Sequence, residues 1–329
     1  MLSKLQNLDF PTKLFEVYQA SAKPVFPIVL REQEDYTSLG NSRIGGYPDL
    51  PKQVEYPRDL GNSPEKDRYY NFIAQINLSE VPGQIDESMP KEGILYFFLH
   101  NDDESMSEVN HLVYYWNGTS SDLQKFQAPA GIKFTGDAYE KPFPAYKISF
   151  ESDHSIDLHH LEDHCQEELQ QNEQLYDLFD RRSRFGGHSY SADGYLTPQI
   201  VYYQNLLSYD ERHLLYQGYL TGEKDFATES SPLLQQYEEK LKIEKSIISQ
   251  QFYQSQIREI HRQRAVENSK KGQEEAYKKI LNDWILLIAI NSIDECEMLW
   301  WDSSVLEFYI NRNELKQLDF SSTFCLINH

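Results

Sequence analysis

Cysteine is scarce in this 329-residue chain, which contains only Cys165, Cys296 and Cys325. So few cysteines exclude the disulfide framework of many small secreted domains, and their odd number favours a reducing compartment. The first residues also lack the continuous apolar segment of a secretory signal. The sequence therefore predicts a cytoplasmic protein.

Long apolar runs and an excess of positive charge are absent as well. The longest apolar run, residues 284–290, is far shorter than the roughly 20 residues that cross a bilayer. The chain has 52 acidic and 31 basic residues and a formal net charge of -21, whereas proteins that bind nucleic-acid backbones carry positive charge. We therefore expect neither a membrane nor a nucleic acid as partner, and we expect the acidic surface to attract a basic protein.

The common signatures of catalysis are missing too. The sequence contains no G-x-S-x-G nucleophile motif, no phosphate-binding G-x-x-x-x-G-K-[ST] loop and no G-x-G-x-x-G dinucleotide motif. Cys296 is flanked by Glu295 and Glu297, whose negative charge raises the pKa of a thiol and opposes thiolate chemistry. These observations indicate no cofactor and no particular catalytic residue, although dispersed catalytic residues leave no such motif.

One segment carries potential metal ligands. On a helix, His160 and His164 would lie one turn apart, a spacing that a zinc ion accepts. Leu161 stands where the HExxH motif has its glutamate, and Cys165 continues a stripe of leucines. We therefore interpret the segment as an amphipathic helix and keep a metal site at His160 and His164 as the alternative.

Most of the remaining pattern indicates β-strands. Short segments rich in β-branched and aromatic residues are bounded by Gly, Pro, Asn or Asp, which is typical of strands. The predicted strands are 25–30, 70–76, 94–99, 111–116, 145–150, 284–290, 297–301, 305–310 and 323–327. A charged segment without interior proline, about 229–283, predicts a long helical insertion.

A glycine pair occurs twice, as Gly45-Gly46 in SRIGGY and as Gly186-Gly187 in SRFGGH. Adjacent glycines allow positive φ and a close approach to a neighbouring strand. Each pair precedes an apolar segment that ends in asparagine and then an aromatic segment: 72–77 and 95–99 after the first pair, 286–291 and 306–310 after the second. We therefore predict that one β-rich unit is present twice through internal duplication.

Together these patterns predict an α+β fold dominated by antiparallel sheet. The first β-rich unit, with an N-terminal helix, is expected over residues 1–152. The second is expected over residues 153–329 and contains the helical insertion.

Several spaced motifs also resemble a known family. The segments GGYPDLP from Gly45, FIAQINLSEVP from Phe72 and PKEGILYFF from Pro90 are similar to the run GGxPxLP, FLAQINLSELP and LPxxGxLxFF of the YwqG-like family, bacterial proteins of unknown function. The segment WDSSVLEFYI from Trp301 resembles the family more loosely. The resemblance implies a cytoplasmic, duplicated, β-rich fold and transfers no activity.

The motif residues fall into two groups with different expected roles. The glycines and prolines are expected to shape turns, and the polar and tryptophan residues to satisfy backbone groups at strand ends. The alternative for the second group is a recognition surface between the two units. The residues are Gly45, Gly46, Pro48, Pro51, Pro82, Gly186 and Gly187 in the first group, and Gln75, Asn77, Trp301 and Asp302 in the second.

The composition suggests how such a protein could act. The chain contains 23 tyrosines and 17 phenylalanines, and large aromatic anchors are common at protein interfaces. We expect a protein-binding module whose acidic, aromatic-rich surface holds a basic partner, and the YwqG-like resemblance, through neighbours of bacterial toxin systems, also suggests an immunity-like role. The alternative is a hydrolytic or metal-dependent enzyme with its site in the cleft between the two units.

Overall fold

The computed structural model describes a strand-rich body and a few helical segments. The described residues are 16, 19–20, 22–59, 68–100, 109–127, 133–135, 141–155, 182–189, 232–244, 249–250, 253–254, 257, 284–301 and 303–328. The predicted metal ligands His160 and His164 lie outside the described residues, as do Asp302 and most of the predicted helical insertion.

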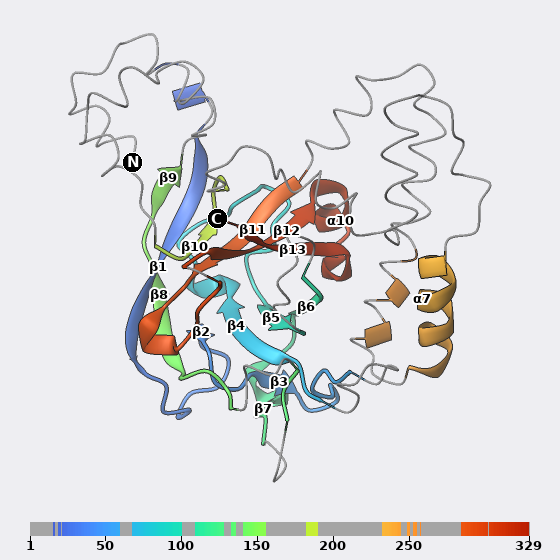
Figure 1. Cartoon of the computed structure of the whole chain (residues 1–329). Helices are drawn as coiled ribbons and strands as arrows, with labels where there is room; N and C mark the ends of the chain where they lie inside the picture. Colours follow the sequence, from blue (N-terminus) through green and yellow to red (C-terminus); the bar gives the residue numbers. More distant parts are fainter. Residues whose placement is uncertain are drawn as a thin grey trace, which may run out of the picture.

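Eleven strands form one sheet (Figure 1). They are β1 (Lys23–Gln33), β2 (Arg43–Ile44), β4 (Asn71–Asn77), β5 (Ile94–Leu99), β6 (His111–Trp116), β8 (Tyr146–Phe150), β9 (Asp153–Ser155), β10 (Arg184–Gly186), β11 (Trp284–Asn291), β12 (Val305–Asn311) and β13 (Thr323–Asn328). The order is β13-β12-β11-β10-β1-β8-β2-β4-β5-β6, with β9 paired to β1. Two further strands, β3 (Asp49–Pro51) and β7 (Leu123–Lys125), pair with each other.

Short helices connect or cover these strands. The α-helices are α7 (Pro232–Ile243) and α10 (Arg312–Lys316). The 3-10 helices are η1 (Leu78–Glu80), η2 (Ser120–Asp122), η4 (Asp294–Cys296) and η5 (Phe320–Ser322). In the described part of the chain, no helix combines the length and the apolar character that a membrane span requires.

The sheet is antiparallel and nearly closed. Every pair of named strands runs antiparallel. The two ends of the strand order approach each other, because the N–H of Val109, just before β6, donates to the carbonyl of Cys325 in β13 at 2.9 Å. The prediction of a predominantly antiparallel β protein is therefore confirmed.

One predicted strand is wrong. Residues 297–301 do not form a strand, and Ile293 forms only an isolated bridge with Met298. Glu297 and Trp301 have φ values of 52° and 46°, which belong to the left-handed region and break an extended chain. The apolar residues of this segment suggested a strand, but their burial comes from a tight turn that presses Met298 and Trp300 into the core.

The sheet contains two groups of strands with the same pairing. The first strand set is β2, β4, β5 and β6, and the second strand set is β10, β11, β12 and β13; within each set, every strand pairs with the next. Arg43 of β2 lies opposite Gln75, and Arg184 of β10 lies opposite Ala289. These positions correspond in the predicted match of the two glycine pairs.

A bulge occurs at the same place in both sets. The register of β4 against β5 shifts between Phe72 and Ala74, and that of β11 against β12 shifts between Leu286 and Ile288. A bulge adds one unpaired residue and bends its strand. Both long strands therefore bend after the second residue of their corresponding segments.

Corresponding positions of the two sets also contact each other. The rings of Phe97 and Phe308 lie 5.1 Å apart, centroid to centroid, and His111 Nε2 lies 3.1 Å from Thr323 Oγ1. Contacts between equivalent positions are the mark of a two-fold arrangement. The two sets thus face each other about an approximate two-fold axis.

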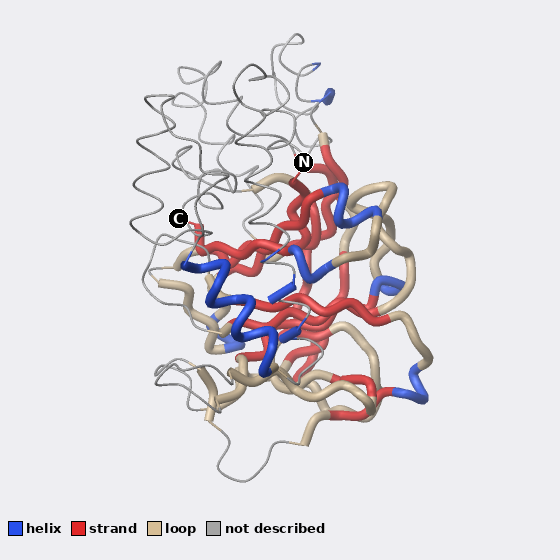
Figure 2. The backbone as a smooth tube through the Cα atoms, turned by 90° about the vertical axis from the view of Figure 1, so that its right-hand side faces the viewer, coloured by secondary structure: helices blue, strands red, loops and turns tan. Residues whose placement is uncertain are grey.

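Side chains alternate between a shared core and two separate outer clusters, as the two-residue period of a strand requires. In β5, Phe97 and Leu99 enter the core that both sets share, whereas Tyr96 and Phe98 enter an outer aromatic cluster under β3 and β7. Helix α7 packs Leu234 on the outer face of the second set, and Figure 2, seen from the side of α7, shows this helix in front of the strands.

Candidate functional site

Both glycine pairs form turns that only glycine accommodates easily. The φ values are 72° and 74° at Gly45 and Gly46, and 79° and 89° at Gly186 and Gly187. A Cβ on Gly45 would lie 2.2 Å from the carbonyl oxygen of Pro144, and one on Gly186 would lie 2.2 Å from Ile85 Cγ2. The turns therefore combine positive φ with a close approach of neighbouring chain.

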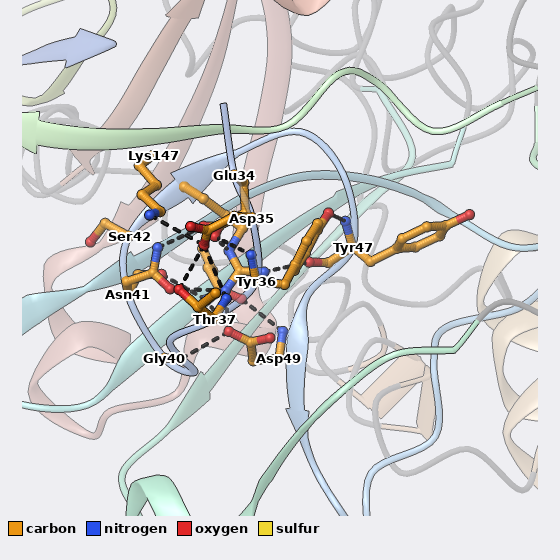
Figure 3. A network of polar contacts seen from close by, with 12 residues as sticks. Glu34, Asp35, Tyr36, Thr37, Gly40, Asn41, Ser42, Tyr47, Asp49 and Lys147 are labelled. Carbon is orange, nitrogen blue, oxygen red and sulfur yellow. Dashed lines mark hydrogen bonds and ion pairs between the residues drawn. The ribbon is translucent and has the colours of Figure 1, made fainter. Parts of the chain in front are cut away.

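The first turn surrounds a fully buried arginine (Figure 3). Arg43 forms an ion pair with Asp49, and its Nε lies 3.3 Å from Glu34 Oε2. Its Nη1 donates to the carbonyl of Tyr47 at 3.1 Å, and its guanidinium lies 4.8 Å from the ring centroid of Tyr36. A buried cation is stable only with such charged and polar partners.

Two residues of the AQIN segment stabilise the same loop. Gln75 Oε1 accepts from the N–H of Asp49 at 2.9 Å, and Gln75 Nε2 donates to the carbonyl of Asn41 at 2.7 Å. Asn77 Nδ2 donates to the carbonyl of Gly40 at 2.9 Å, and the Asn77 N–H donates to Ser42 Oγ at 2.9 Å. In these contacts Gln75 and Asn77 bind backbone groups.

The second turn repeats part of this network. Arg184 Nη2 donates to the carbonyl of His188 at 2.8 Å, as Arg43 does to Tyr47. The N–H of Asn291 donates to Ser183 Oγ at 3.0 Å, as the N–H of Asn77 does to Ser42.

The acid near the second arginine comes from another place. Glu307, fully buried on β12, accepts from Ser189 Oγ at 2.9 Å, Tyr309 at 2.6 Å and Asn328 Nδ2 at 2.6 Å. Burial and the charge of Glu307 both raise the pKa of Tyr309, so this phenol stays a proton donor. Glu307 occupies the position that corresponds to Tyr96 in the first set.

The remaining motif residues have varied surroundings. Pro48 and Pro51 are buried at β3, and the carbonyl of Pro48 accepts from the N–H of Phe126 at 3.1 Å. Pro82 is exposed in the turn after η1, and Trp301 is partly buried against the shared core.

A cavity of about 230 Å³ opens where the two strand sets meet. Its walls come from β6 on one side and from the turn into η5 on the other, with one residue from the 253–254 segment. The lining residues are Val113, Tyr114, Tyr115, Gln254, Leu318, Asp319, Phe320 and Ser321. The predicted cleft between the two units would fall at this place.

Three aromatic rings and one carboxylate shape this cavity. The rings of Tyr115 and Phe320 lie 5.0 Å apart, and Tyr115 Oη donates to the carbonyl of Glu92 at 3.0 Å. Asp319 Oδ1 accepts from the N–H of Ser321 at 3.1 Å and caps η5. Burial raises the pKa of Tyr114 and of Tyr115, so both phenols are neutral at physiological pH.

Leu318, at the rim, has an unusual backbone conformation. It follows α10 with φ of 56°; its N–H donates to the carbonyl of Leu315, and the N–H of Asp319 donates to the carbonyl of Glu314. This is the Schellman ending of a helix, in which glycine usually takes the left-handed position. Leu318 therefore carries a strain of about 1 kcal/mol and still leaves 45% of its surface exposed.

The described residues offer little for metal or thiol chemistry. Within them, no three His, Cys, Asp or Glu side chains come together as a ligand group. Burial, with a smaller contribution from Glu295, raises the pKa of Cys296 to about 12. The predicted direction of this shift is confirmed, although burial is the larger cause.

The cavity residues were not singled out by the sequence patterns. Asp319 and Phe320 come from opposite ends of a turn, and Tyr114 and Tyr115 belong to a strand more than two hundred positions earlier. The local signal is limited to Asp319 and Ser321, whose spacing fits a capped turn. Only the pairing of strands brings the walls together.

Comparison with known families assigns the fold described above to one group. The family model described as Domain of unknown function (DUF1963) matches residues 42–328. The chain belongs to this family. No curated protein matches the sequence. The match is consistent with the predicted resemblance, and the YwqG-like name stays a prediction.

The DUF1963 match includes both glycine turns and every described residue of the cavity. Strand β1 lies before the match, yet it pairs with β8 and β10 at the centre of the strand order. Glu34 and Tyr36, which contact Arg43, also precede the match.

Proposed function

We propose that this protein is a cytoplasmic protein-binding module that holds a basic partner at the cavity between β6 and η5. The observation that supports the proposal is the joint presence of Asp319 and three aromatic side chains in one concave surface. Aromatic anchors in a pocket and complementary charge are common in protein recognition. The formal net charge of -21 favours a basic partner over the whole surface.

The chemistry of the cavity favours binding over catalysis. Its described lining residues contain one carboxylate and neither histidine nor cysteine. Acid–base hydrolysis usually uses two cooperating groups, and a catalytic zinc uses three protein ligands. A hydrolytic or metal-dependent enzyme stays the alternative hypothesis, and no described lining residue supports it.

Internal duplication is part of the same proposal. The shared register, the two bulges and the contacts between corresponding positions support an origin from one β-rich unit. On this view a binding surface between the copies is a property of the pair, which neither copy would have alone. The helical insertion of the second unit, of which α7 is described, would be a later addition.

Affinity capture with matched baits tests the binding proposal. Wild-type protein, Asp319→Asn and Glu87→Gln are immobilised, and proteins from the native host are captured at low and at high salt. Asp319→Asn removes one charge and keeps an oxygen that can cap η5, while Glu87→Gln removes one charge at an exposed residue outside the cavity.

A basic protein should be recovered with the wild type and with Glu87→Gln, and its recovery should fall with salt and with Asp319→Asn. Equal recovery by all three baits, or recovery that raised salt leaves unchanged, would contradict the proposal. The identity of the captured protein would also test the predicted immunity-like role.

A further inference from the structure

We infer that the cavity receives one arginine side chain of the partner, and that Leu318 at its rim packs against a neighbouring apolar residue of the same partner. This inference rests on the proposed function and names the chemical group that the site recognises.

The size and charge of the cavity limit its ligand. About 230 Å³ is below the roughly 300 to 1,000 Å³ of pockets for drug-sized molecules, so a single side chain fits better than a cofactor. Asp319 would repel an anion, and no described lining residue carries a positive charge. Aromatic faces attract cations through their quadrupole. A cationic side chain satisfies all of these conditions.

The distribution of acceptors favours arginine over lysine. The wall offers oxygen atoms from Asp319, Ser321 and Gln254 at different points. A guanidinium has five N–H donors in a planar fork and stacks on aromatic rings, whereas an ammonium is a compact, strongly hydrated charge. The tilted pair of Tyr115 and Phe320 supplies such rings, so the cavity suits a planar cation.

Leu318 indicates that the partner is a macromolecule. Its left-handed backbone and its exposed side chain are both unfavourable in the isolated protein. Glycine would remove both costs at this position. A free small cation inside the cavity would not need Leu318, whereas a partner chain that crosses the rim would cover it. The contact thus gives a reason for leucine at a position that glycine usually occupies.

Binding of small probes tests the arginine assignment. Nα-acetyl-arginine amide, the uncharged isostere Nα-acetyl-citrulline amide and Nα-acetyl-lysine amide are titrated into the full chain, and tyrosine NMR signals are followed. Arginine should bind about tenfold more tightly than citrulline and at least about threefold more tightly than lysine, and Asp319→Asn should weaken arginine binding by about tenfold. Equal affinity for arginine and citrulline, tighter binding of lysine, or full binding by Asp319→Asn would overturn the assignment.

Substitution of Leu318 tests the rim contact. Leu318→Gly should raise Tm by about 2 to 4 °C and should lower capture of the basic partner by at least about fivefold. Ser303→Gly is the matched control, because Ser303 is also exposed, has φ of 72° and does not line the cavity. It should raise Tm similarly and leave capture unchanged. Unchanged capture by Leu318→Gly would overturn the rim contact.

The two levels of the hypothesis fail in different ways. Capture that depends on Asp319, without arginine-specific probe binding, would overturn the arginine inference and leave the proposed function intact. Arginine-specific probe binding, without any partner whose capture depends on Asp319, would overturn the proposed function and leave the chemistry of the cavity intact.

Discussion

The first and the second strand set share a backbone arrangement but differ in what covers them. Both have a glycine turn, a buried arginine and a bulge in the long strand. The outer face of the first set is covered by β3, β7 and aromatic side chains, and that of the second by α7. The comparison teaches that a few backbone-binding positions maintain the frame, while the outer side chains follow the covering element.

The buried acids illustrate this difference. Asp49, which pairs with Arg43, lies on β3 and is supplied by the covering strands. In the second set the buried acid is Glu307, which lies within the sheet itself on β12. Gln75 and Tyr96 of the first set correspond to Ala289 and Glu307 of the second. Each set thus keeps a charged interior but builds it differently.

Removal of the two acids should have the largest effect. Asp49→Ala leaves Arg43 without its closest carboxylate, and Glu307→Ala removes the acceptor of three donors. Each substitution should lower the free energy of unfolding by about 4 kcal/mol, because buried charged partners lose their compensation. Urea unfolding followed by circular dichroism measures both values.

The exposed Glu87→Ala is the control and should change the free energy of unfolding by less than about 0.5 kcal/mol. A cost below about 1 kcal/mol for Glu307→Ala alone would show that the two buried networks are not equivalent, and the comparison would then be limited to the backbone.

Alanine at corresponding glycines should have a smaller, unequal effect. Gly45→Ala would place a Cβ against the backbone oxygen of Pro144, whereas Gly186→Ala would place it against the side chain of Ile85, which can shift. We expect losses of about 3 and about 2 kcal/mol in the free energy of unfolding, including the strain of positive φ. The same urea experiment measures them, and equal losses would mean that strain at positive φ alone decides the cost.

Acid should weaken the contact between the two sets. Burial lowers the pKa of His111 from 6.5 to about 4, so the unfolded chain binds a proton that the folded protein excludes. Stability is therefore complete above pH 6.5 and falls as the pH decreases toward 4. Between pH 7.5 and pH 5 this group should lower the free energy of unfolding by about 2 kcal/mol.

The variant His111→Gln keeps polar atoms near Val109 and Thr323 but does not titrate at these pH values. Urea unfolding of both proteins at the two pH values isolates the histidine contribution, since the other groups are common to both. An identical pH dependence in wild type and variant would show that His111 does not carry a shifted pKa.

Several elements could be predicted from the sequence because their signals are local. Strands β5 and β6 have the predicted bounds, since alternating aromatic and β-branched residues lie between clear turn signals. The segment 297–301 was predicted wrongly, because the apolar residues of a tight turn resemble those of a buried strand. The cavity was not predicted, since its walls come from β6 and η5, whose local patterns carry no information about their proximity.

The sequence by itself determined the antiparallel strands, the positions of the glycine turns and the acidic net charge, because each depends on residue type and near-neighbour spacing. Only the tertiary structure decided which strands face each other, where Arg43 finds its carboxylates and how Asp319 comes to share a wall with Tyr114 and Tyr115. These contacts join residues that are distant along the chain, so they are determined by packing of the shared core and not by local preference.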